Sequence, residues 1–132
     1  NIQLAIENIP DDPSERILEE TLRRFPEKHI GVGYDSSHAN LAESPFGVLE
    51  RHRERVIALH ISDNSGESDD HTLPFEGSID WMRFREIFSG LNYRGTLLLE
   101  VEMRESAFKD PKTFLEEARK RGERLIELWL CD

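Results

Sequence analysis

Acidic and imidazole side chains stand at the ends of four apolar segments of this chain. They are Glu7, Asp35, His60 and Glu100. Three carboxylates and one imidazole brought together would repel one another unless a proton or a cation lay between them. A divalent cation would balance their charge, and a mixed set of oxygen and nitrogen ligands suits Mn²⁺, Co²⁺, Zn²⁺ or Mg²⁺. If the four groups converge, the sequence predicts a divalent-metal site.

Two short motifs supply further candidate ligands. Asp35 and His38 form the pattern D-x-x-H, and Asp69 and His71 form D-x-H. Both spacings are compact enough to hold a metal ion, although either pattern alone is common by chance. We therefore treat His38, Asp69 and His71 as possible additional metal or substrate ligands.

A polar loop at 62–78 contains the second motif. Its length is one at which loops are more often functional than structural. Asp63 and Asn64, at its start, are expected to bind substrate hydroxyls or to shape the turn. The many small and acidic residues of this loop also allow a plainly solvated loop.

Strand and helix patterns alternate along the chain. Short apolar segments predict strands, and amphipathic segments predict helices. The predicted strands cover 2–7, 29–35, 56–62 and 96–102, and the predicted helices cover 17–25, 44–56, 78–92 and 110–130. For the first helix, Ser14 or Asp12 is the expected cap, with Pro13 in the first turn.

This alternation predicts an α/β fold of parallel strands joined by right-handed helical crossovers. The strands read as apolar on both faces, as expected when helices cover one side and a second layer or a barrel interior covers the other. In such folds the loops after the carboxyl ends of the strands build the active site. Taken singly, each strand-end residue is more often a helix cap or a solvated group. Their recurrence at one topological position favours a shared site.

With these residues assembled, the chain resembles the xylose isomerase-like TIM-barrel superfamily. That superfamily holds sugar and sugar phosphate isomerases and epimerases, together with the apurinic endonucleases of family 2, which use three zinc ions. The matching pieces are IEN (6–8), YDSSHAN (34–40), HISDN (60–64), DDHTLPFEGSIDW (69–81) and YRGTLLLEVE (93–102).

The resemblance implies the second half of a (β/α)8 barrel, strands five to eight, with each strand followed by a helix. We therefore expect residues 1–132 to be a single domain, a C-terminal half-barrel that is a fragment of a longer chain. Four strands alone would leave open edges and apolar surface. The half-barrel would pair with the missing half or with another copy as a homo-oligomer.

For an isomerase or epimerase, the resemblance implies one metal ion held by Glu7, Asp35, His60 and Glu100. Glu7 and Glu100 would also move a proton through an enediolate, and His38 would place a substrate oxygen. For an endonuclease, His38, Asp69 and His71 would join these four as metal ligands. A third alternative is a non-catalytic half-barrel remnant.

Composition favours one of these alternatives. The formal net charge of −10 repels polyanions, so we expect a small sugar or sugar phosphate as substrate rather than nucleic acid. We favour the isomerase or epimerase.

The sequence has no apolar run of the roughly 18 residues that cross a bilayer. One cysteine makes no internal disulfide, and we expect a cytoplasmic protein.

Overall fold

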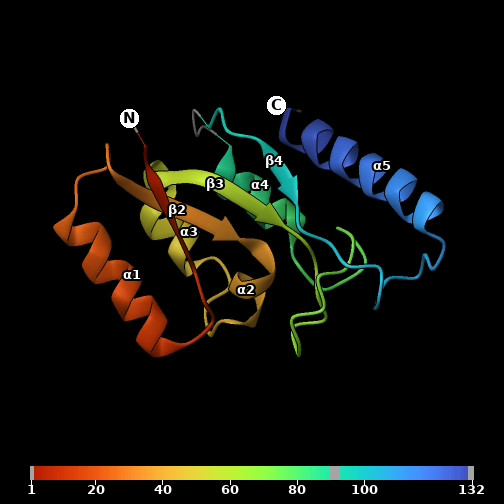
Figure 1. The fold of residues 1–132 in the computed structure, drawn as a ribbon, viewed down its shortest axis with the longest axis horizontal. Helices are drawn as coiled ribbons and strands as arrows, with labels where there is room; N and C mark the ends of the chain where they lie inside the picture. Colours follow the sequence, from red (N-terminus) through yellow and green to blue (C-terminus); the bar gives the residue numbers. More distant parts are fainter. Residues whose placement is uncertain (1, 90–92, 131–132) are drawn as a thin grey trace.

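The computed structural model describes residues 2–89 and 93–130. Its elements alternate between strand and helix along the chain (Figure 1). They are β1 (Leu4–Glu7), α1 (Asp12–Arg24), β2 (Ile30–Asp35), α2 (Ser36–Leu41), α3 (Gly47–His52), the 3₁₀ helix η1 (Arg53–Arg55), β3 (Val56–Ile61), α4 (Trp81–Phe88), β4 (Leu97–Leu99) and α5 (Pro111–Leu130).

The described strands form one parallel sheet in the order β1-β2-β3-β4. Every strand therefore pairs with its neighbour in sequence, as expected when helical crossovers join parallel strands. In the sheet register, Glu7 pairs with Gly33 and Asp35 pairs with His60. The predicted α/β class and its parallel sheet are confirmed.

Alternation along the strands separates two faces of the sheet. One face packs against the helices, and its strand residues join a single core cluster with α1, α3, α4 and α5. The strand side chains in or against this cluster are Ile6, Ile30, Val32, Tyr34, Val56, Leu59, Ile61, Leu97 and Leu99. Because successive side chains point to opposite faces, the residues between them lie on the other face. Glu7, Asp35, His60 and Glu100 all fall on that face.

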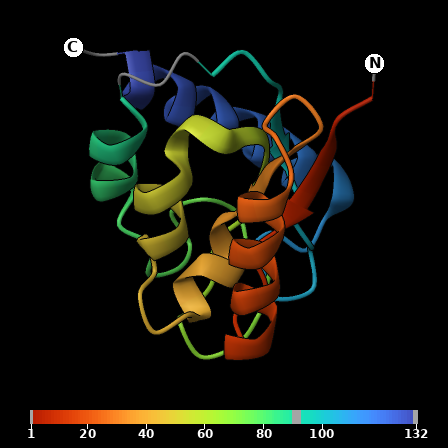
Figure 2. The same cartoon turned by 90° about the vertical axis from the view of Figure 1, so that its left-hand side faces the viewer.

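The face away from the helices is less apolar than the sequence predicts. Gly31, Gly33 and Ala5 occupy it in β1 and β2, and Leu98 in β4 is 49% exposed. Ala5, Gly31 and Gly33 contribute little apolar side chain to this face. Figure 2 shows α3 and α4 on one side of the sheet and β1 at the opposite side of the molecule.

The helices α1, α3, α4 and α5 overlap the four predicted helices, but several of their ends differ from the prediction. In α1 the cap is Asp11, whose Oδ1 accepts a hydrogen bond from the Ser14 amide at 2.9 Å, and not Ser14 or Asp12. The helix predicted at 78–92 is shorter and begins at Trp81, because Asp80 caps the amides of Met82 and Arg83. The last part of that prediction lies outside the described residues.

Two further differences occur next to the predicted site. The short helix α2 begins immediately after Asp35, whose carboxylate caps it by accepting from the His38 amide at 2.7 Å. Strand β4 covers three residues rather than the seven predicted, and Glu100 continues its line by donating its amide to the Ile61 carbonyl at 3.0 Å.

The loop after β3 is anchored by Asp63, which is fully buried. Its Oδ1 accepts from the amides of Asn64 and Ile79, and its Oδ2 accepts from the Phe75 amide and the Trp81 indole. Gly77 passes so close that a Cβ there would lie 2.3 Å from Asp63 Oδ1. Burial raises the pKa of Asp63, while the hydrogen bonds from Ile79 and Trp81 oppose that rise.

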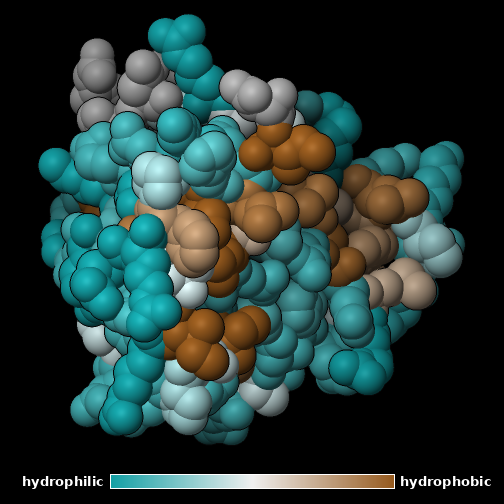
Figure 3. All heavy atoms as spheres, turned by 60° about the vertical axis from the view of Figure 1, so that its left-hand side comes forward, coloured by the Kyte–Doolittle hydropathy of each residue, from teal (hydrophilic) through white to brown (hydrophobic). Residues whose placement is uncertain are grey.

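Both edges of the sheet carry exposed apolar side chains. Leu4 in β1 is 61% exposed, and Ile2 just before it is 83% exposed. Figure 3 shows a band of hydrophobic residues across an otherwise hydrophilic face. Apolar patches of this kind usually mark contact surfaces.

No helix among the described residues is long and apolar enough to span a membrane.

Candidate metal centre

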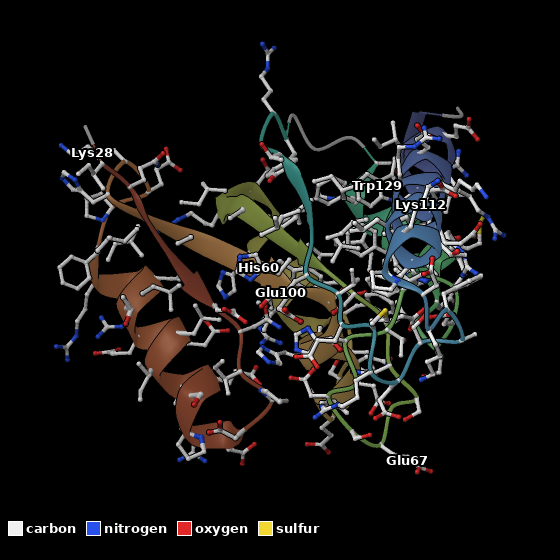
Figure 4. All side chains as sticks on the ribbon, turned by 45° about the vertical axis from the view of Figure 1, so that its right-hand side comes forward. Lys28, His60, Glu67, Glu100, Lys112 and Trp129 are labelled. Atoms are coloured by element: carbon white, nitrogen blue, oxygen red, sulfur yellow. The ribbon has the colours of Figure 1, made fainter. Side chains whose placement is uncertain are left out.

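The four strand-end side chains converge at the carboxyl ends of the strands. Ligand atoms of Glu7, Asp35 and His60 all lie within 4.8 Å of one another. His60 Nδ1 is 2.9 Å from Glu100 Oε2 and 3.6 Å from Glu7 Oε2. Figure 4 shows His60 and Glu100 side by side at the ends of β3 and β4. The structure therefore brings together the four groups that the sequence placed at equivalent strand ends.

Two buried atoms of this first cluster lack hydrogen-bond partners, and a cation would satisfy both. Asp35 Oδ2 and His60 Nδ1 are buried and make no hydrogen bond. The His60 contact with Glu100 is short but lacks hydrogen-bond geometry. Burial raises the pKa of Asp35, the nearby charges of Glu7 and Glu100 raise it further, and the His38 amide opposes them. An unpaired buried carboxylate among other carboxylates is costly without a counter-charge, so the residues fit a divalent metal ion.

A second cluster forms from His38, Asp69 and His71, whose ligand atoms also lie within 4.8 Å of one another. Asp69 Oδ2 is 3.2 Å from His38 Nε2 and 3.0 Å from His71 Nε2. The D-x-x-H and D-x-H motifs therefore meet in space, although 31 positions separate His38 from Asp69. His38 also adjoins the first cluster, because its Nδ1 is 2.9 Å from Glu7 Oε1.

Backbone carbonyls orient both imidazoles of the second cluster. His38 Nδ1 lies 3.1 Å from the Asn8 carbonyl, and His71 Nδ1 lies 2.9 Å from the Glu100 carbonyl. A carbonyl only accepts, so each Nδ1 faces it as a donor and each Nε2 faces Asp69. Metal-binding histidines are commonly held in this way.

The surroundings of His71 favour positive charge next to Asp69. Burial lowers the pKa of His71, but the hydrogen bond to Glu100 and the charge of Asp69 outweigh it, so this pKa lies above its ordinary value. Two imidazole nitrogens that face one carboxylate oxygen can be bridged to it by protons or by a metal ion. The chemistry of this cluster suits either.

His71 is held in an uncommon backbone conformation. Its φ is 47°, in the left-handed region that non-glycine residues rarely adopt. The Glu102 amide donates to the His71 carbonyl at 2.7 Å, and the ring contacts the Glu100 carbonyl. These bonds tie the loop to the residues after β4 and hold the imidazole in place.

Asp63 and Asn64 lie beneath the loop rather than in the clusters. Both are fully buried. Asn64 Nδ2 donates to the carbonyl and hydroxyl of Ser37, and its Oδ1 accepts from Asn40 and Gly66. These contacts support the turn-shaping alternative, while binding of substrate hydroxyls by this pair stays a prediction.

Sequence reasoning missed Asn8. This residue is buried, directly follows Glu7, and contacts the backbone of Asp35. The available signal was a polar side chain next to a strand-end glutamate, which is easily read as an ordinary strand terminator. His29 and His52 have no predicted role in the site. His52 Nε2 pairs with Glu19 Oε2 at 2.9 Å, between α3 and α1.

The chain belongs to the xylose isomerase-like TIM-barrel family, whose model matches residues 1–124. It is 41% identical over 107 residues to the uncharacterized protein y4fM of Sinorhizobium fredii, covering 78% of this chain and 34% of that protein. It is 25% identical over 134 residues to the uncharacterized protein MJ1311 of Methanocaldococcus jannaschii, covering 96% of this chain and 46% of that protein. The chain thus spans half or less of the length of these relatives.

Two solved structures share the fold. A D-tagatose 3-epimerase-like protein superposes with a TM-score of 0.76 at 23% identity, covering 97% of this chain and 48% of that one. A xylose isomerase domain protein from Alicyclobacillus acidocaldarius superposes with a TM-score of 0.64 at 19% identity, covering 97% and 52%. The four-stranded sheet described here is therefore part of a TIM-barrel architecture.

Proposed function

We propose that the protein containing this chain is a divalent-metal-dependent isomerase or epimerase of a sugar or sugar phosphate. The observation that carries the proposal is the approach of Glu7 and Glu100 to the same atom, His60 Nδ1, beside the unpaired Asp35 Oδ2. Membership of the xylose isomerase-like family supports the same class of chemistry.

Glu7, Asp35, His60 and Glu100 would hold the metal ion. When bound, a divalent ion supplies positive charge that stabilises the enediolate formed from vicinal carbonyl and hydroxyl groups. Mn²⁺, Co²⁺, Zn²⁺ and Mg²⁺ all accept such a mixture of carboxylate and imidazole ligands.

Proton transfer falls to the two glutamates. Glu7 extends from β1 and Glu100 follows β4, so they come from opposite edges of the sheet. One carboxylate would take the proton from the substrate carbon, and the other would return a proton to the neighbouring carbon or to the opposite face. His38, whose Nδ1 lies 2.9 Å from Glu7 Oε1, would place a substrate oxygen.

A related proposal concerns the rest of the barrel. We infer that β1 to β4 are strands five to eight of a closed barrel, and that residues 1–132 form its C-terminal half. The other half would cover the exposed apolar residues of β1 and β4 and complete the substrate pocket. A small polyol suits the net charge of −10 better than a nucleic acid, and we retain the cytoplasm as the proposed location.

A second candidate is a zinc-dependent phosphodiesterase resembling the apurinic endonucleases. The observation in its favour is the second cluster, in which Asp69 Oδ2 lies between His38 and His71. Clustered metal ions suit phosphodiester hydrolysis, because they stabilise both the attacking and the leaving oxygen.

Metal analysis and substrate assays separate these candidates. Plasma mass spectrometry of the purified protein should find about one divalent ion per chain for the isomerase, and turnover of ketoses or aldoses in D₂O should place deuterium on the substrate carbon. Three zinc ions with cleavage of abasic DNA would favour the phosphodiesterase. A folded protein that binds no metal would contradict both and favour the non-catalytic alternative.

A further inference from the structure

Asn8 makes a paired contact with the backbone of Asp35. Its Nδ2 donates to the Asp35 carbonyl at 2.9 Å, and the Asp35 amide donates to its Oδ1 at 2.8 Å. The carboxamide thus offers one donor and one acceptor, as a peptide group of a neighbouring strand would. Asn8 is only 5% exposed, so water does not readily replace it.

The position of this contact matters because pairing between β1 and β2 stops before Asp35. The last residue pair is Glu7 with Gly33. Without the Asn8 side chain, β1 would provide no partner for the Asp35 amide and carbonyl, which would be left unsatisfied in a buried place. The Asn8 carboxamide therefore extends the sheet to the residue that carries the candidate ligand.

The other atoms of Asp35 show the consequence of that contact. Its Oδ1 is held by the His38 amide at 2.7 Å, while its buried Oδ2 makes no hydrogen bond. Both backbone polar groups and one carboxylate oxygen are thus fixed, and the remaining oxygen is directed by them. The position and orientation of a metal ligand depend on the groups that form hydrogen bonds to it.

We propose that Asn8 is a positioning residue of the metal centre, and that its carboxamide sets the place of the Asp35 carboxylate through the Asp35 backbone. The inference rests on the proposed metal-dependent function. The backbone carbonyl of Asn8 also faces His38 Nδ1 at 3.1 Å, so this one residue contacts two candidate ligands.

The test compares Asn8→Ala with Gln3→Ala in the purified protein. Gln3 is a matched control, because its side-chain amide also donates to a backbone carbonyl, that of Glu27 at 2.9 Å, but near the start of β1. Calorimetric titration with Mn²⁺ should show affinity lowered about 10- to 100-fold in Asn8→Ala and unchanged in Gln3→Ala. The absorption spectrum of bound Co²⁺ should change only in Asn8→Ala.

Three further measurements cover loss of folding. Asn8→Asp keeps the size and an acceptor but loses the donor to the Asp35 carbonyl, and it should also change the Co²⁺ spectrum. In the unaltered protein, titration with Zn²⁺ should shift the NMR resonances of the Asn8 side-chain amide and leave those of Gln3 in place. Leu22→Ala, which removes a buried side chain of α1, should lower stability without changing the Co²⁺ spectrum.

The outcomes separate this inference from the proposed function. Metal binding by the unaltered protein with the same affinity and Co²⁺ spectrum in Asn8→Ala would overturn the positioning role alone. An unaltered protein that binds neither Mn²⁺, Co²⁺ nor Zn²⁺ would overturn the proposed function and this inference with it.

Discussion

His60 and Glu100 belong to neighbouring parts of the sheet, and His60 Nδ1 lies 2.9 Å from Glu100 Oε2. Nothing in their spacing along the chain requires this contact. It arises because β3 and β4 pair in parallel with His60 beside Leu98, which places Glu100 at the end of the next strand. The imidazole is thereby placed among carboxylates, whose negative charges repel one another without a counter-charge.

Removal of metal is expected to lower stability. A ligand that binds only the folded state raises the free energy of unfolding by about 2.7 kcal/mol when present at 100 times its Kd. Thermal unfolding with added Mn²⁺ and with a chelator should therefore differ clearly. Asp35→Asn should abolish the difference, whereas the surface variant Glu102→Gln should retain it. Equal melting temperatures with and without Mn²⁺ in the unaltered protein would contradict a metal centre.

In the metal-free protein, Asp35→Asn should be stabilising near neutral pH. Burial raises the pKa of Asp35 above its ordinary value of 3.8, so its charged form opposes folding. A group with a raised pKa contributes fully to stability below its unfolded pKa and loses that contribution as pH rises through its folded pKa. The advantage of the variant should therefore shrink as the pH falls toward 3.8. Urea unfolding of both proteins with chelator across this range measures it, and a pH-independent difference would count against the assignment.

Glu7→Gln and Glu100→Gln should each abolish sugar turnover while leaving the protein folded. Loss of an acid or base costs on the order of 10²- to 10⁴-fold in rate, and each change also removes a metal ligand. Glu102→Gln is the control, since Glu102 is an exposed glutamate two positions beyond Glu100. Deuterium uptake by substrate reports the proton transfer directly. Full activity in both glutamine variants would rule out the two-base mechanism.

His71→Ala should distinguish the two enzymatic candidates. In a phosphodiesterase with several metal ions, loss of His71 should remove at least one ion per chain and most of the activity, because His71 faces Asp69 in the second cluster. In an isomerase with one ion, metal content should stay the same and turnover should fall less. Plasma mass spectrometry and the matching activity assay give the answer, with His52→Ala on the outer helices as the control.

The anchor at the start of the loop should be important for stability. Asp63→Ala would leave four donors without their buried acceptor, and we expect a loss of at least about 3 kcal/mol in the free energy of unfolding. Asp80→Ala, which removes only the cap of α4, should cost about 1 kcal/mol. Urea unfolding measures both. Similar small losses in the two variants would show that Asp63 does not anchor the loop.

The sequence by itself determined the order of elements and the residues at the strand ends. Apolar segments that stop at Glu7, Asp35, His60 and Glu100, separated by amphipathic segments, predicted parallel strands with their polar ends together, and the structure places them so. Local patterns suffice here because strand alternation and crossover chirality allow few arrangements.

Only the tertiary structure decided which polar residues share a space and which support others. The meeting of His38 with Asp69 and His71, the burial of Asp63 beneath the loop, and the contact of Asn8 with Asp35 all join segments distant in the chain. Such contacts depend on strand register and on how the loop folds back, which residue spacing does not encode. A carboxylate in a ligand cluster and one that anchors a turn look alike in sequence, because burial and hydrogen-bond partners arise only when the chain folds.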